Sequence, residues 1–141
     1  MKIDFGAIGG GVHRFPVHVF YNATDVGRVV YYANYLRFAE EARGAMFELL
    51  APNVGGSVEG FVVRSCNTDY LKSAVYGDDL VVETSVLEVS KVYIVLRQRV
   101  MRGEELLVNM DVKLVYVSFE AMGRPQRLPE FWKEKLEGLG V

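Results

Sequence analysis

The stretch from Tyr21 to Leu50 constrains the fold of this chain more than any other part of the sequence. It reads YNATDVGRVVYYANYLRFAEEARGAMFELL, a polar turn followed by one long amphipathic pattern. Apolar residues recur at the three- and four-residue spacing of a helix with one buried face: they are Tyr35, Ala39, Ala42, Met46 and Leu49. Charged residues mark the expected wet side: they are Arg37, Glu40, Glu41, Arg43 and Glu48. We predict one long helix. Gly44 costs it about 1 kcal/mol relative to alanine, which indicates close packing there.

The turn before this helix carries a single acid, Asp25, with Gly27 two residues later. The first N–H groups of a helix are unpaired, and the helix dipole adds partial positive charge at that end. A carboxylate beside such donors suits acyl transfer, because the acid attacks or activates water while the N–H groups hold an oxyanion. Aspartate is equally typical of a helix cap or an Asx turn, so spacing alone leaves both interpretations open.

The bulk composition bounds the class of protein. A length of 141 residues favours one domain over residues 1–141, and 50% hydrophobic residues suffice for a core. The net charge of −2 gives no reason to expect nucleic acid or an anionic membrane as a partner. A single cysteine, Cys66, excludes an intramolecular disulfide, and no apolar run approaches the ~20 residues of a membrane helix. We expect a soluble, cytoplasmic protein without stable membrane insertion.

The rest of the chain predicts an antiparallel sheet. Residues 1–11 are glycine-rich and are expected to form a loose arm. Pro16 indicates that the first strand lies at a sheet edge or that the proline is near the start of the strand. Alternation or β-rich composition predicts five strands: they span residues 14–21, 61–70, 80–89, 92–100 and 106–117. Pro129 opens a short terminal helix. This is an α+β layout, with the long helix on the concave face of a curved sheet of about five strands. Its uncovered edges predict a homodimer or homotetramer.

Two motifs carry a resemblance to a known family. Residues 21–43, YNATDVGRVVYYANYLRFAEEAR, resemble the signature of the hotdog-fold thioesterases related to 4-hydroxybenzoyl-CoA thioesterase. The nearest branch is that of the short acyl-CoA thioesterases found alongside the bacterial Tol-Pal system. Residues 69–80, DYLKSAVYGDDL, resemble the family's motif entering the third strand. The resemblance covers about residues 12–129 and implies a hotdog fold, a curved sheet wrapped around one central helix.

The resemblance also implies an activity and its residues. The family's catalytic acid falls on Asp25, and the backbone amide that polarises the thioester carbonyl falls on Tyr32, with Gly27 shaping the turn. The implied reaction hydrolyses an acyl-CoA thioester to free acid and coenzyme A, with Asp25 as nucleophile or general base. Coenzyme A is part of the substrate, and no cofactor is implied. Two positions depart from many relatives, because Ala23 replaces an Asp and Tyr32 replaces a His that could donate a proton or contact a substrate hydroxyl.

Several other residues are candidate substrate contacts. Tyr31, Tyr32 and Tyr35, together with Phe38, either wall the acyl pocket or belong to the core. Asn34 either caps the helix or contacts the preceding loop.

Polar residues later in the chain extend the set of candidates. Asn67 either lines the pocket floor or belongs to a polar strand end that serves as a turn. Arg124 and Arg127 flank Pro125 on a basic loop, where they are candidate contacts for the phosphates of coenzyme A. Cys66 is expected in the core, and no cluster has metal-ligand spacing, so we expect no metal.

Two rival functions stay open. A hotdog hydratase or dehydratase needs a His with an acid, and neither His13 nor His18 is placed for that chemistry by the sequence. A non-catalytic acyl-CoA or acyl-carrier-protein binding module would not need an unpaired carboxylate at the turn. An acyl-carrier protein is also an alternative donor of the acyl group.

Overall fold

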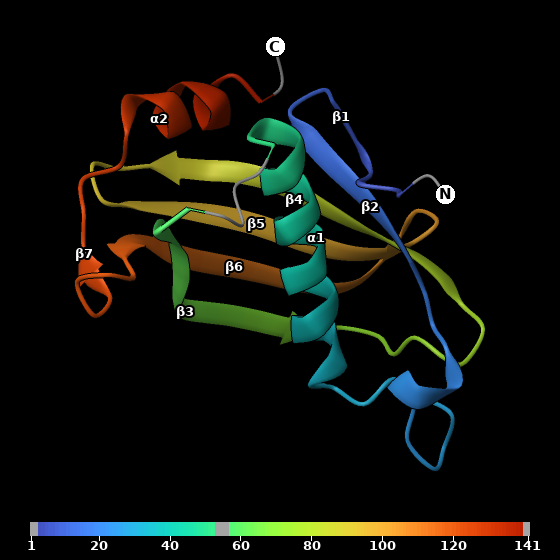
Figure 1. Ribbon diagram of the computed structural model, residues 1–141. Helices are drawn as coiled ribbons and strands as arrows, with labels where there is room; N and C mark the ends of the chain where they lie inside the picture. The colour runs from blue at the N-terminus through green and yellow to red at the C-terminus, as the bar shows by residue number, and fades with distance from the viewer. Residues whose placement is uncertain (1–2, 53–56, 140–141) are drawn as a thin grey trace.

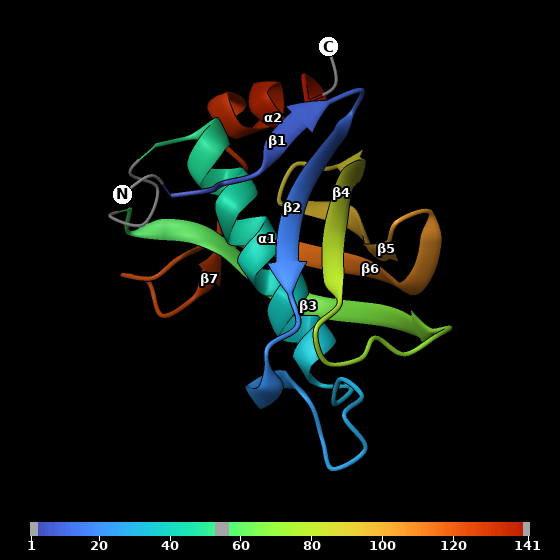
Figure 2. The ribbon, with the colours of Figure 1, turned by 90° about the vertical axis from the view of Figure 1, so that its right-hand side faces the viewer.

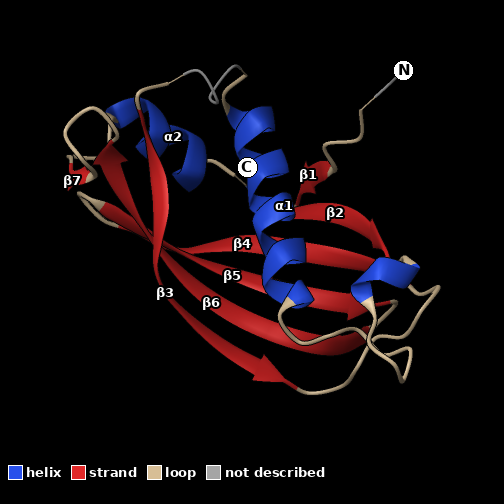
Figure 3. Ribbon diagram, turned by 60° about the horizontal axis from the view of Figure 1, so that its bottom comes forward, coloured by secondary structure: helices blue, strands red, loops and turns tan. Residues whose placement is uncertain are grey.

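The chain folds as one curved antiparallel sheet around the helix α1, Asn34–Leu50, in a computed structural model that describes residues 3–52 and 57–139 (Figure 1). Figure 3 shows the strands bending past α1, which lies on their concave side. A second helix, α2, spans Glu130–Glu137 directly after Pro129, as the sequence predicts. The predicted α+β hotdog layout is confirmed.

The sheet contains the five predicted strands and two short additional ones. Their bounds are β1 Ala7–Gly9, β2 Val12–His18, β3 Glu59–Tyr70, β4 Asp79–Val89, β5 Tyr93–Arg102, β6 Glu105–Ser118 and β7 Arg124–Pro125. The order is β1-β2-β4-β5-β6-β3, and β7 pairs with β6. The prediction of a loose arm over residues 1–11 is wrong at β1, which pairs with β2. Gly10 and Gly11 close this hairpin, with φ values of 61° and 81° that glycine adopts readily. Residues 1–2 of the arm lie outside the described residues.

The two edges of the sheet differ in how well they are covered. On one side, β1 pairs only with residues 12–14 of β2, so Pro16 lies where β2 is the outermost strand, as predicted. On the other side, β3 bonds to β6 alone and is 12 residues long. Its outer edge has no strand partner among residues 3–52 and 57–139.

The core lies between α1 and the concave face of β4, β5 and β6. Alternate residues of these strands point at the helix. Apolar and polar residues therefore alternate in the sequence, which allowed the strands to be predicted. The inward residues of β6 are all buried: Val108, Met110, Val112, Leu114 and Tyr116. The predicted helix face is also buried except at its end, where Leu49 is 40% exposed.

A buried polar network ties α1 to the sheet and overturns one prediction. Arg43, expected on the wet side, is only 7% exposed and donates to Gln98 Oε1 at 2.9 Å. Gln98 Nε2 in turn donates to Ala39 O at 2.9 Å and to Thr84 Oγ1 at 3.1 Å. Burial lowers the pKa of the Arg43 guanidinium. The network forms because a polar residue on the core face of β5 needs partners, and α1 supplies them.

The close packing expected at Gly44 is not present among the described residues. A Cβ built on Gly44 would meet no described atom within 4 Å. The residue instead lines a cavity of about 470 Å³ between α1 and β3, together with Phe47, Phe61 and Val63. This side of α1 is therefore left open.

His13 on β2 is the one histidine buried completely. Its Nε2 lies 2.7 Å from Phe5 O, which fixes the N-terminal arm against β2. Its Nδ1 has no hydrogen-bond partner among the described residues. Burial lowers the pKa of His13, since a charged imidazole would lose its hydration there.

This burial predicts how stability depends on pH. The folded protein holds His13 neutral, whereas the unfolded chain binds a proton near pH 6.5, so the unfolded state takes up more protons below that value. The free energy of unfolding should decline as pH falls from 7 to 5.5, by up to about 1.4 kcal/mol per unit. Urea denaturation of His13→Gln should show a flatter decline, and the half-exposed His18→Gln is the control. Equal pH slopes for wild type and His13→Gln would contradict the prediction.

Candidate active site

Asp25 lies in a small hairpin, residues 23–31, that precedes α1; we call it the Asp25 hairpin. Two contacts join its strands: the β-bridge between Thr24 and Val30, and the hydrogen bond from Asp25 N–H to Val29 O at 2.9 Å. At the turn, Gly27 N–H donates to Asp25 Oδ1 at 2.9 Å. The Asx-turn interpretation is therefore correct. Asp25 is nevertheless exposed, and its Oδ2 has no partner within the described residues.

The turn owes its shape to two residues after Asp25. The left-handed backbone falls on Arg28, with φ of 62°, rather than on Gly27. A Cβ on Gly27 would lie 3.4 Å from Asp25 Oδ1, so glycine leaves room for the carboxylate. The strain at Arg28, about 1–2 kcal/mol for a residue with a side chain, is offset in part because its carbonyl accepts Tyr76 N–H at 2.9 Å.

Residues 73–78, the supporting segment, carry the Asp25 hairpin. Val30 N–H donates to Ala74 O at 2.9 Å, and Val29 bridges to Val75. Ala74 N–H donates to the Tyr35 hydroxyl at 2.8 Å, which connects the segment to α1. The two sequence motifs, residues 21–43 and 69–80, are thus brought into direct contact, as Figure 2 shows at the foot of α1.

The start of α1 lies at the base of the same hairpin. The first helical residue is Asn34, so Tyr32 precedes the helix by two residues. Within the described residues, the Tyr32 N–H has no acceptor. Asn34 does not cap the helix: its Nδ2 donates to Ala23 O at 2.9 Å, which is the predicted contact to the loop.

The aromatic residues at this end divide between surface and core. Tyr31 and Tyr32 are 48% and 60% exposed, whereas Tyr35 is 3% exposed. Tyr35 therefore lies behind the site, against the expectation that it contacts substrate, and burial raises its pKa. Tyr70 at the end of β3 joins the group, with its ring 6.2 Å from that of Tyr32 and 5.9 Å from that of Tyr35. The sequence analysis missed Tyr70, although it stands inside the second motif.

A bulge in β3 decides where Asn67 and Cys66 lie. The register with β6 shifts between Val63 and Ser65, which reverses the faces of all later residues. Asn67 pairs with Asp111 on the convex face, away from α1, so the structure does not bring it to Asp25. Cys66 pairs with the buried Val112 and faces the concave side, yet it is exposed. The expectation of a core cysteine is wrong.

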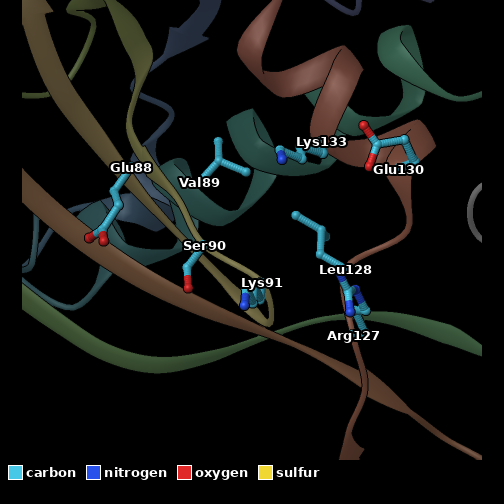
Figure 4. A pocket seen from close by; sticks show the side chains of 8 residues that line it. All are labelled: Glu88, Val89, Ser90, Lys91, Arg127, Leu128, Glu130 and Lys133. Carbon is cyan, nitrogen blue, oxygen red and sulfur yellow. The ribbon is translucent and has the colours of Figure 1, made fainter.

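Arg124 and Arg127 lie at the far end of the sheet from Asp25. Arg124 pairs with Ser118 at the end of β6, beside the start of β3. Arg127 lines a cavity of about 420 Å³ with Lys91 and Lys133, whose charges Glu88 and Glu130 partly balance. Figure 4 shows Lys91 on the turn between β4 and β5, Arg127 on the chain entering α2, and Lys133 on α2 itself. Neither arginine is brought to the Asp25 hairpin of its own protomer.

The structure also reveals a histidine–acid pair that the sequence analysis missed. His18 Nδ1 lies 2.7 Å from Asp79 Oδ1, because the two residues are opposite each other in the β2–β4 register. Across residues 3–52 and 57–139, no three His, Cys, Asp or Glu side chains gather as metal ligands. No helix in that same part of the chain is long and apolar enough to span a membrane.

The fold and the exposed acid before its helix define a hotdog-fold protein with a candidate hydrolytic site. The profile of the thioesterase superfamily matches residues 27–109. Acyl-CoA thioesterase YbgC of Haemophilus influenzae is 38% identical over 120 residues, covering 82% of this chain and 88% of that protein. The YbgC thioesterase of Helicobacter pylori is 39% identical over 134 residues, covering 86% and 97%. The structure of a probable thioesterase from Bartonella henselae aligns with a TM-score of 0.74 at 30% identity, covering 84% and 99%. The chain belongs to the thioesterase superfamily.

Proposed function

We propose that this chain hydrolyses acyl-CoA thioesters to a free acid and coenzyme A, with Asp25 as nucleophile or general base. The observation that carries the proposal is an exposed Asp25 carboxylate on a fixed hairpin. The far strand of this hairpin leads directly to the Tyr32 N–H, which has no acceptor among the described residues. The family and the names of the YbgC relatives support the same reaction. An acyl-carrier protein is the alternative acyl donor.

The chemistry sets where the thioester must lie. Asp25 pairs with Val29, three residues before Tyr32, so the hairpin leads from the acid to the Tyr32 N–H. A reacting carbon needs an attacking oxygen at about 3–3.5 Å, and an oxyanion needs an N–H donor at about 3 Å. In the proposed mode of binding, the thioester carbonyl lies between the Asp25 carboxylate and the Tyr32 N–H. The Tyr32 amide would then stabilise the charge that develops on the carbonyl oxygen.

Direct attack is the route that we favour for Asp25. The chain has two histidines, His13 and His18, and both lie on β2 outside the hairpin. No imidazole of the hairpin can therefore relay a proton from water. In the direct route, a carboxylate oxygen bonds to the acyl carbon, the carbon–sulfur bond breaks and the coenzyme A thiolate leaves. Water then opens the mixed anhydride and restores the Asp25 carboxylate.

The exposed edge of β3 supports a homodimer. Within the described part of the chain, its outer edge has no strand partner, and inward-facing residues such as Val63 and Tyr70 are 49% and 47% exposed. Long uncovered edges promote pairing with another chain. Antiparallel pairing of two β3 strands about a two-fold axis would cover both edges and extend the sheet across the dimer.

Such a dimer would also explain the position of the two arginines. Along β3, the start near Arg124 and the end near the Asp25 hairpin are separated by roughly 35–40 Å, for 12 residues. An antiparallel two-fold places the start of one β3 beside the end of the other. Arg124 and Arg127 of one protomer would then bind coenzyme A phosphates at the site of its partner. A homotetramer built from such dimers stays an alternative.

A hotdog hydratase or dehydratase is the second candidate, because the His18–Asp79 pair supplies the histidine and acid that such chemistry uses. Both of these side chains lie outside the Asp25 hairpin. A binding module without catalysis is the third possibility. Thiol release and water addition, measured on saturated and α,β-unsaturated acyl-CoA, separate the three.

Replacing Asp25 by Asn should abolish turnover, because the change removes the charge and keeps the shape. We expect kcat to fall by at least about 100-fold with little change in KM, since the carboxylate acts in the chemical step. The matched control is Asp4→Asn, because Asp4 makes the same bond to a glycine N–H two residues later, at 2.8 Å. Retention of a tenth of the wild-type kcat by Asp25→Asn, in a folded protein, would exclude Asp25 as the catalytic acid.

Reversing the charge of Arg124 and Arg127 should raise KM for a full acyl-CoA about tenfold or more. It should leave KM for the matching acyl-pantetheine nearly unchanged, because that substrate lacks the nucleotide phosphates. Arg99→Glu, on the exposed face of β5, controls for the reversal of a single charge and is compared with Arg124→Glu and Arg127→Glu made one at a time. Equal effects on both substrates would show that these arginines do not bind phosphate.

A further inference from the structure

Arg102, at the end of β5, joins three separate parts of the chain. Its Nη1 donates to Asp78 Oδ2 at 2.8 Å, and its Nη2 donates to Glu105 Oε1 at 2.6 Å. Lys72 Nζ lies 2.6 Å from the other oxygen of Glu105. The bonds from Lys72 and Arg102 lower the pKa of Glu105, so Glu105 stays charged at neutral pH. The network fixes Arg102 from both sides.

Asp78 carries this restraint into the supporting segment. The same Oδ2 that accepts from Arg102 also accepts Val75 N–H at 2.9 Å. Val75 is the residue that bridges to Val29 of the Asp25 hairpin. Hydrogen bonds therefore link Arg102 to Asp78 and Asp78 to Val75, and the neighbours of Val75, Ala74 and Tyr76, bond to the strand opposite Asp25.

We propose that Arg102 is a positioning residue, which holds the supporting segment so that the Asp25 hairpin keeps its catalytic geometry. The proposal rests on the proposed function of Asp25. Arg102 contacts no residue of the hairpin itself and acts only through Asp78 and the supporting segment. A displacement of about 1 Å at a reacting group costs up to about 100-fold in rate, whereas a half-exposed ion pair adds little to global stability.

The chain contains a matched ion pair away from the site. Arg97 Nε and Nη2 donate to the two oxygens of Asp111 at 2.9 and 3.1 Å, on the convex face. The exposed fraction of the Arg97 side chain is 35%, against 33% for Arg102. A purely structural role for Arg102 predicts equal effects of Arg102→Gln and Arg97→Gln.

The first readout is amide hydrogen exchange, which does not depend on catalysis. Arg102→Gln should speed exchange at least tenfold in peptides that cover residues 24–31 and 73–78, which include the bonded N–H groups of Val30 and Tyr76. Arg97→Gln should leave exchange in those peptides within twofold of wild type. Equal exchange in the two variants would overturn the proposal.

The second readout is steady-state kinetics with acyl-CoA. Arg102→Gln should lower kcat 10- to 100-fold with KM within twofold of wild type, and Arg102→Lys should recover part of the loss. Asp78→Asn, which keeps an oxygen for Val75 N–H, should lower kcat by a smaller factor. This variant replaces Arg102→Gln in the test if Arg102→Gln does not fold. Faster exchange with unchanged kcat would overturn the positioning role. Failure of the proposed function gives a different result from failure of the positioning role, because Asp25→Asn would then retain turnover.

Discussion

Two backbone hydrogen bonds, Val30 N–H to Ala74 O and Tyr76 N–H to Arg28 O, hold the candidate site together. They join segments that are far apart in the sequence, and the bridge between Val29 and Val75 lies between them. Backbone bonds of this kind fix the register of the hairpin without using its side chains. The Asp25 side chain is therefore exposed to solvent while the backbone that carries it is restrained.

The helix and sheet support this arrangement from one side and leave the other side open. The Arg43–Gln98 network and the apolar face of α1 hold the helix against β4, β5 and β6. Among the described residues, Phe47 of α1 stacks on Phe61 of β3 at 5.0 Å, but the cavity beside Gly44 is open and Tyr70 is 47% exposed. The outer edge of β3, which has no strand partner among the described residues, is the edge beside the candidate site. In the proposed homodimer, a second copy of the chain would cover this edge.

The sequence predicted the structure correctly wherever the spacing of apolar residues alone determines which face of a helix or strand is buried. The faces of β5 and β6 and most of the buried face of α1 follow from spacing, and the two motifs identified the family. The positions of Arg43 and Asn67 were not predicted, because they depend on contacts with other parts of the chain. Arg43 is buried because Gln98 accepts its bond across the core. Asn67 lies on the convex face because the bulge after Val63 shifts the alternation by one residue. Neither effect has a local signal in the sequence.

Subunit complementation tests the composite site most directly. A heterodimer of Asp25→Asn with the Arg124→Glu/Arg127→Glu chain is purified with two tags and assayed at low acyl-CoA. If Asp25 and the arginines of one site come from different protomers, one of the two sites is fully native. The heterodimer should then reach about half the activity of the wild-type dimer, well above either parent. If both come from the same protomer, no native site exists, and the activity should equal half that of the arginine variant. That second result would contradict a site shared between protomers.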